Sequence, residues 1–197
     1  MRSKISTALA LLLVTTLGTG TALAQGFKLP PLLVESASFP DGGIVPAKNS
    51  FRGGNVQPDF KITNAPDGTV SYAVIFHDID VALGGTTDDV LHWVAWNIPA
   101  TAGVTQIAEG QLPEGSVTGK NIQGQNSFMG SGAPAGPRLH HYVFEFYALS
   151  AKLDLPATSS RPELLAAMKG KIVAKAAYVG RFVGAPAPAA APAAPAK

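Results

Sequence analysis

Histidine is scarce in this sequence and concentrated where strands are expected to begin or end. The chain has four histidines, at positions 77, 92, 140 and 141. Asp78 and Asp80 follow the first of them closely, and a glycine-rich stretch, 130–136, precedes the last two. Strand ends that meet at one edge of a sheet would bring these imidazoles, carboxylates and glycines together. The pattern therefore predicts a polar site at such an edge.

Three kinds of chemistry use these residue types. A zinc site requires three or four ligands, and no local ligand motif such as H-E-x-x-H is present. A Ser-His-Asp hydrolase would have Ser127 and Ser131 available, but neither lies in a G-x-S-x-G or comparable context. The third kind is an anion site, in which imidazoles and Tyr142 donate hydrogen bonds and Gly130 and Gly132 let backbone N–H groups approach a phosphate. In an anion site, a carboxylate such as that of Asp78 would orient a neighbouring imidazole rather than touch the anion.

Short apolar segments separated by turn residues must position these groups. Runs rich in Val, Ile and aromatic residues predict strands at 70–80, 91–100, 139–149 and 171–183. The segment 160–170 predicts a helix, since it begins with a Ser-x-x-Glu capping box and ends in glycine. We expect a mostly antiparallel β domain with one or two short helices near its C-terminus.

Alternation along the strands predicts which side chains share a face. The even-numbered residues from 140 to 146 are aromatic or histidine, which indicates the buried face and places His140 and Tyr142 on it. His141 should then point outward. In the strand that begins near 92, strict alternation places His92 on the same face as Val94 and Trp96.

The two ends of the chain differ from the rest. Arg2 and Lys4 precede an apolar stretch that is followed by an A-x-A-like site, which predicts a signal peptide over residues 1–24. The apolar stretch is too short for a membrane anchor. Residues 184–197 are almost entirely Ala and Pro, which predicts a disordered tail. One domain over residues 25–183 remains.

Composition narrows the range of partners. The chain has 15 Lys and Arg against 13 Asp and Glu, and loss of Arg2 and Lys4 with the signal peptide makes the two numbers equal. No basic cluster is present, so we do not expect a nucleic-acid-binding protein. We also expect no transmembrane segment. The absence of cysteine argues against a disulfide framework and a lipoprotein anchor, and the export signal favours the periplasm.

The order of motifs resembles the phosphatidylethanolamine-binding protein family, in its bacterial Raf-kinase-inhibitor-like branch. The D-P-D-x-P signature of the family corresponds to residues 78–82, which are followed by His92-Trp93 and by the sequence NIPA at 97–100. Its second signature, G-x-P-P-x-G…H-R-Y, corresponds to 132–136 and 140–142. Flanking segments extend the resemblance over about residues 36–183 in unbroken order.

The resemblance implies a fold and a ligand site. The fold would be two antiparallel sheets packed together with short helices. The pocket, at the strand ends, would bind phosphate-like anions such as phospholipid head groups. Carried over position by position, the ligand-binding residues are Asp78, His92, Gly132, His140 and Tyr142. We expect no metal, no cofactor and no catalytic residue.

Several positions depart from the family pattern. Ile79 stands between the two aspartates in place of proline, Ala133 replaces the first pocket proline, and His141 replaces an arginine. Phe128 stands where a tyrosine is usual, which removes one hydroxyl group. The aspartates at 88–89 either place negative charge at the pocket mouth or belong to a solvated loop.

We therefore expect an exported, non-enzymatic binding protein with a small anion pocket. The alternative is a protein-level regulator, such as an inhibitor of a protease or kinase, because family members act mostly as binding or inhibitory proteins. A hydrolase or metal enzyme is the third hypothesis.

Overall fold

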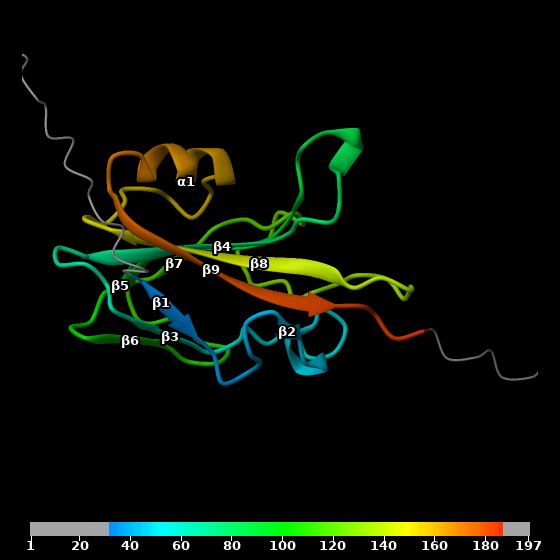
Figure 1. The fold of residues 1–197 in the computed structure, drawn as a ribbon. Coiled ribbons are helices and arrows are strands. Elements are labelled where there is room, and N and C mark those ends of the chain that lie inside the picture. Colours follow the sequence, from blue (N-terminus) through cyan, green and yellow to red (C-terminus); the bar gives the residue numbers. More distant parts are fainter. Residues whose placement is uncertain (1–31, 187–197) are drawn as a thin grey trace, which may run out of the picture.

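The fold consists of two β-sheets and one α-helix. The computed structural model describes residues 32–186. The expected signal peptide, and the expected tail apart from residues 184–186, lie outside this range. Within it, two sheets pack together with a single α-helix, α1 (Arg161–Met168) (Figure 1). The predicted mostly β fold is confirmed. No helix in the described part of the chain is long and apolar enough to cross a membrane.

The strands divide unequally between the two sheets. The smaller sheet has the order β1-β3-β6, with β1 at Leu33–Glu35, β3 at Phe60–Thr63 and β6 at Val104–Ile107. The larger sheet has the order β2-β9-β8-β4-β5-β7, with bounds Gly43–Ile44 (β2), Ser71–Asp78 (β4), Val90–Pro99 (β5), Val117–Thr118 (β7), His140–Leu149 (β8) and Ile172–Phe182 (β9). Neighbouring strands are antiparallel except for β2, which pairs with β9 in parallel. Two 3-10 helices, η1 (Ala47–Asn49) and η2 (Leu83–Gly85), lie in the loops.

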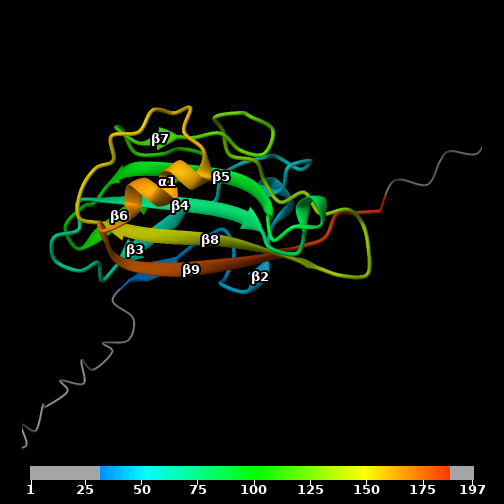
Figure 2. The same cartoon turned by 90° about the horizontal axis from the view of Figure 1, so that it is seen from above.

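The larger sheet forms the middle layer of the molecule. The smaller sheet covers one of its faces and α1 covers the other, where α1 lies across the central strands (Figures 1 and 2). Phe60, Phe76 and Phe144 are buried between the two sheets. Leu164 and Met168 of α1 are buried against the opposite face. Because β4 is central and covered on both faces, all its residues are buried.

The four long strands and the helix lie where the sequence predicts them. Strands β4, β5, β8 and β9 match the predicted segments to within two residues at each end. Helix α1 has Ser160 as its N-cap, with the reciprocal capping-box bonds to Glu163. Gly170 after the helix has φ of +76°, a conformation that glycine adopts without strain.

Alternation holds in β8 but fails at the start of β5. Tyr142 and Phe144 lie between the sheets, as predicted, and His141 is exposed. In β5, however, Phe76 pairs with Trp93 whereas the next residue of β4 pairs with Leu91. His92 is therefore the extra residue of a β-bulge.

The bulge changes the face to which His92 belongs. Its ring lies 5.3 Å from the ring of Phe76 and 5.2 Å from that of Tyr142, both between the sheets. Val94 and Trp96 belong to the core under α1. The prediction that His92 shares their face is wrong, because an inserted residue reverses the alternation that precedes it.

Two segments far apart in sequence touch beside this end of the sheet. Phe51 N–H donates to the Ser131 carbonyl at 2.9 Å, and Ser50 and Ser131 form an isolated β-bridge. The backbones approach so closely that a Cβ atom at Gly130 would lie 2.6 Å from the Ser50 carbonyl carbon. Glycine at 130 is thus required for the glycine-rich stretch to lie against residues 49–52.

We predict that Gly130→Ala destabilises the fold by roughly 1–3 kcal/mol, because the clashing atoms are backbone and cannot rotate away. Gly136→Ala is the matched control, since a Cβ atom there meets nothing within 4 Å. Urea unfolding of both variants measures the difference. Equal midpoints for the two variants would contradict the close approach.

Candidate functional site

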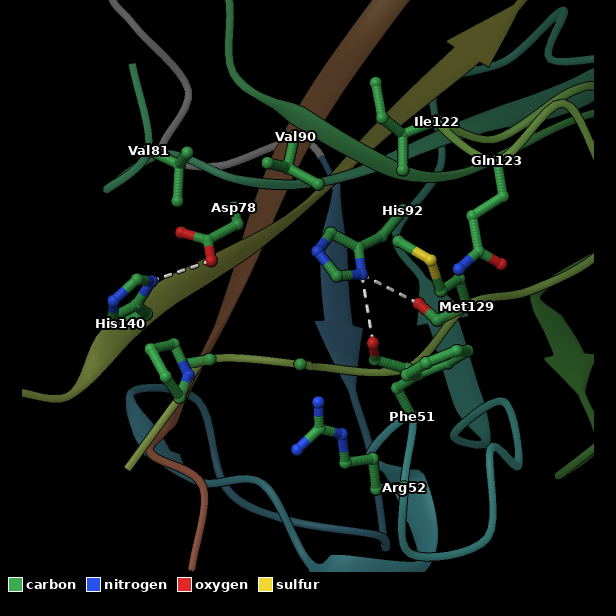
Figure 3. Close-up of a pocket in the computed structure, with 14 residues that line it drawn as sticks. Phe51, Arg52, Asp78, Val81, Val90, His92, Ile122, Gln123, Met129 and His140 are labelled. Carbon is green, nitrogen blue, oxygen red and sulfur yellow. Dashed lines mark hydrogen bonds and ion pairs between the residues drawn. The ribbon is translucent and has the colours of Figure 1, made fainter. Parts of the chain in front are cut away.

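A pocket of about 290 Å³ opens where β4 ends and β5 and β8 begin. Asp78, His92 and His140 lie along one side of it, and Arg52 lies on the opposite side (Figure 3). The remaining lining residues are Phe51, Val81, Val90, Ile122, Gln123, Met129, Gly130, Gly132, Ala133 and Pro134. Four of the five predicted ligand-binding residues therefore line one pocket. The fifth, Tyr142, is not among the lining residues.

Asp78 and His140 form a hydrogen-bonded pair. Asp78 is the last residue of β4, and His140 is the first residue of the adjacent strand β8. The Nδ1 atom of His140 lies 2.8 Å from the Asp78 Oδ2 atom, with the carboxylate side chain 4% exposed. The other carboxylate oxygen accepts the Asp80 N–H at 3.0 Å. Because a carboxylate can only accept here, Nδ1 of His140 carries the proton and the ring orientation is fixed.

His92 is held by two backbone carbonyl groups. Its Nδ1 atom lies 3.0 Å from the oxygens of both Met129 and Gly130. These acceptors assign the ring proton to Nδ1. Burial lowers the pKa of His92 below its ordinary value, and the carbonyls and the charge of Asp78 offset the shift only in part. The imidazole is therefore neutral near pH 7.

Tyr142 supports the glycine-rich wall of the pocket, the lining formed by Gly130, Gly132 and Ala133, although it does not line the pocket itself. Its side chain is fully buried, and its hydroxyl oxygen accepts the N–H groups of Gly132 at 3.1 Å and Ala133 at 2.8 Å. Burial, followed by the charge of Asp78 and hydrogen bonding to it, raises the pKa of Tyr142 far above its ordinary value. The phenol therefore stays protonated. In this geometry it positions the glycine-rich wall, whereas the sequence suggested that it would donate to the anion.

The glycine N–H groups are likewise engaged elsewhere. Gly130 N–H donates to the Asn55 Oδ1 atom at 2.7 Å, and Gly132 N–H donates to Tyr142. The expectation that these two groups point at a phosphate is therefore not met in this structure. Their bonds fix the wall rather than line the pocket with donors.

Arg52 is the lining residue that sequence reasoning missed. It is the only Lys or Arg that lines the pocket. Residues 32–186 contain four arginines, of which Arg138, Arg161 and Arg181 donate hydrogen bonds. Arg52 makes no hydrogen bond or ion pair within this range. Its place follows from the contact between residues 50–51 and Ser131, which no local sequence signal reveals.

His77 and the loop carboxylates form a separate cluster. His77 faces away from the pocket, with Nδ1 2.5 Å from Asp89 Oδ2, and Asp89 also accepts Arg161 at 2.5 Å. Asp80 bonds to Arg138 and His141 outside the pocket. Neither of the aspartates at 88–89 lines the pocket, so they do not place negative charge in its lining.

The described residues offer limited means for metal binding or nucleophilic attack. No group of three or more His, Cys, Asp or Glu within 32–186 could hold a metal ion. The residues that line the pocket include no serine, threonine, cysteine or lysine. Ser127 and Ser131 are not among them either. The pocket combines two oriented imidazoles, one carboxylate and one arginine.

The lowered pKa of His92 predicts a pH-dependent stability. In the unfolded chain His92 binds a proton near the ordinary pKa of 6.5, whereas in the folded protein it binds that proton only at a lower pH. Between about pH 7 and pH 5 the unfolded state therefore binds more protons, and the free energy of unfolding falls as the pH falls. We expect a shallower fall in His92→Gln, measured by urea unfolding across that range. His141→Gln, at an exposed position, is the control, and equal slopes in both variants would contradict the burial of a neutral imidazole.

Comparisons with known proteins agree with this architecture. A family model described as phosphatidylethanolamine-binding protein matches residues 35–183. A UPF0098 protein of Pyrococcus horikoshii is 35% identical over 189 residues, which cover 92% of this chain and 90% of that protein. A protein of Mycobacterium tuberculosis named as the lipoprotein LppC is 33% identical over 154 residues. These cover 78% of this chain and 73% of that protein.

Solved structures show the same fold. The crystal structure of Escherichia coli YbcL, described as a member of the mammalian PEBP family, superposes with a TM-score of 0.70 and 28% identity, covering 79% of this chain and 99% of that chain. A phosphatidylethanolamine-binding protein homologue of Chlamydia trachomatis superposes with a TM-score of 0.67 and 27% identity, covering 77% and 96%. The two-sheet fold, the family model and the ordered motifs agree, and the chain belongs to the phosphatidylethanolamine-binding protein family.

Proposed function

We propose that this protein is an exported, non-enzymatic binding protein whose pocket holds a small phosphate-like anion, either free phosphate or a phospholipid head group. The observation that carries the proposal is the convergence of the Asp78–His140 pair, His92 and Arg52, which has no partner within residues 32–186, on one pocket. Its volume of about 290 Å³ lies at the small end of ligand pockets. A small polar ligand fits such a site better than a large apolar one.

The kinds of polar group that line the pocket support a binding role rather than a catalytic one. The Asp78–His140 pair has the form of an oriented imidazole base, but no hydroxyl or thiol side chain lines the pocket for it to activate. The groups present orient a ligand and balance its charge. Incubation with generic ester and phosphoester substrates, together with metal analysis, tests the enzymatic alternative.

Export is supported by sequence and by a relative. Residues 1–24 have the pattern of a signal peptide, and LppC has the word lipoprotein in its name. We infer a periplasmic location. Fractionation of cells that express the full chain tests it, with the mature N-terminus expected after residue 24.

A protein partner is the second candidate, favoured by apolar side chains around the pocket mouth. Phe51 and Ile122, which both line the pocket, are 40% and 50% exposed. Exposed apolar groups gathered around a polar site are typical of an interaction surface. An inhibitor of a protease or kinase would use this rim. Loss of a defined partner in an Ile122→Asp variant would support that role, and unchanged capture would argue against it.

Titration with phosphate, followed by NMR, tests the proposed anion site. We expect the imidazole signals of His92 and His140 to shift at millimolar phosphate while those of His77 and His141 stay in place. His140→Ala should weaken binding by about tenfold or more, because it leaves the Asp78 carboxylate without its partner. The adjacent His141→Ala should leave the Kd unchanged. Stationary signals from both pocket histidines would contradict the proposal.

A further inference from the structure

The pocket contains fewer hydrogen-bond donors than its residue types suggest. Both pocket imidazoles use their Nδ1 proton within the protein, His92 toward carbonyls and His140 toward Asp78. Neither Nε2 atom makes a hydrogen bond within residues 32–186. A neutral imidazole with its proton on Nδ1 presents a lone pair at Nε2. The neutral ring of His92 therefore offers the pocket an acceptor, not a donor.

Neither the backbone N–H groups of the glycine-rich stretch nor Tyr142 supplies further hydrogen-bond donors to the pocket. Gly130 N–H donates to Asn55, and the N–H groups of Gly132 and Ala133 donate to Tyr142. These bonds hold the wall in place. Of the charged or titratable side chains that line the pocket, Arg52 alone has all its N–H groups free of partners among residues 32–186. Gln123 contributes one amide, which can donate or accept.

The charged groups around the pocket also indicate that a bound anion needs Arg52. Asp78 is the negative charge that faces His92 and His140. His77, on the opposite side of the sheet, lowers the pKa of His92. Tyr142 is a neutral phenol beside both pocket rings. Arg52 is the positive charge across the pocket, with its guanidinium group directed into the space between (Figure 3). An anion beside Asp78 therefore depends on Arg52 for its countercharge.

A ligand that fits this pattern must accept on one side and donate on the other. The planar guanidinium matches two oxygens of a tetrahedral oxyanion. The lone pair at Nε2 of His92 requires a hydrogen on the ligand, because an oxygen lone pair placed against it would leave a buried acceptor unpaired. Hydrogen phosphate carries both features, whereas sulfate and a phosphodiester carry no proton on oxygen.

We propose that the pocket selects oxyanions that retain a proton, with Arg52 binding the charged oxygens and Nε2 of His92 accepting the P–O–H group. This inference rests on the proposed anion-binding function and specifies its ligand class. It favours free phosphate over a diester head group as the source of the bound phosphoryl group. Arg52 and the His92 tautomer are then the specificity determinants of the site.

Calorimetric titration of the mature protein near pH 7.5 compares phosphate with sulfate. At that pH both ions are mainly tetrahedral dianions, and phosphate keeps one proton. We expect phosphate to bind about tenfold or more tightly than sulfate, since sulfate leaves the Nε2 acceptor unpaired. Dimethyl phosphate, a diester without a proton on oxygen, should bind as weakly as sulfate or more weakly.

Variants separate charge from proton recognition. Arg52→Gln should weaken phosphate and sulfate alike, by about tenfold, because it removes the countercharge for both. Arg138→Gln is the control, since Arg138 is paired with Asp80 outside the pocket and its loss should leave both affinities unchanged. His92→Gln supplies an amide N–H in place of the lone pair and should bring the two affinities close together.

Each outcome bears on a different claim. Equal affinities of the native protein for phosphate and sulfate would overturn the selection for a protonated anion and leave the anion site standing. Unchanged binding in Arg52→Gln would overturn the role of Arg52. No binding of either anion to folded protein, verified by its unfolding transition, would overturn the proposed function and this inference with it.

Discussion

The pocket depends on one inserted residue in β5. The bulge at His92 turns its imidazole from the helix-covered face to the space between the sheets, beside Phe76 and Tyr142. From there Nδ1 reaches the carbonyls of Met129 and Gly130 and ties the glycine-rich wall to the strand. Without the extra residue, alternation would carry His92 into the core under α1. The sheet edge would then lack the group that holds the opposite wall.

Most of the hydrogen-bond donors near the pocket are engaged in bonds that hold its glycine-rich wall and its imidazoles in place. Tyr142 accepts two backbone N–H groups, Asn55 accepts a third, and both imidazoles donate inward. Each of these bonds satisfies a partly or fully buried polar group, as a folded protein requires. Arg52 is the only Lys or Arg that lines the pocket opposite these groups. The bonds that hold the glycine-rich wall are therefore the same bonds that remove donors from the pocket.

Long periodic elements were predictable from sequence, and so was part of the site. The aromatic alternation of β8 identified the face of His140 and Tyr142, and the capping box identified the start of α1. The family resemblance implied two packed sheets, but the strands of the smaller sheet were not located from sequence, because strands of three or four residues carry too little periodic signal. Alternation alone should also have separated His77 from Asp78, which are adjacent in β4 and point to opposite faces.

What sequence could not provide were facts that depend on pairing and tertiary contact. The bulge exists only in the register between β4 and β5, and Arg52 reaches the pocket only because residues 50–51 lie against Ser131. Nitrogen-15 NMR of the histidine rings tests the central claim most directly. Near pH 7.5, where the ordinary histidine is mostly neutral, the account predicts that His92 carries its proton on Nδ1 and that phosphate shifts the bare Nε2 signal. A proton on Nε2, or an Nε2 signal indifferent to bound phosphate, would contradict it.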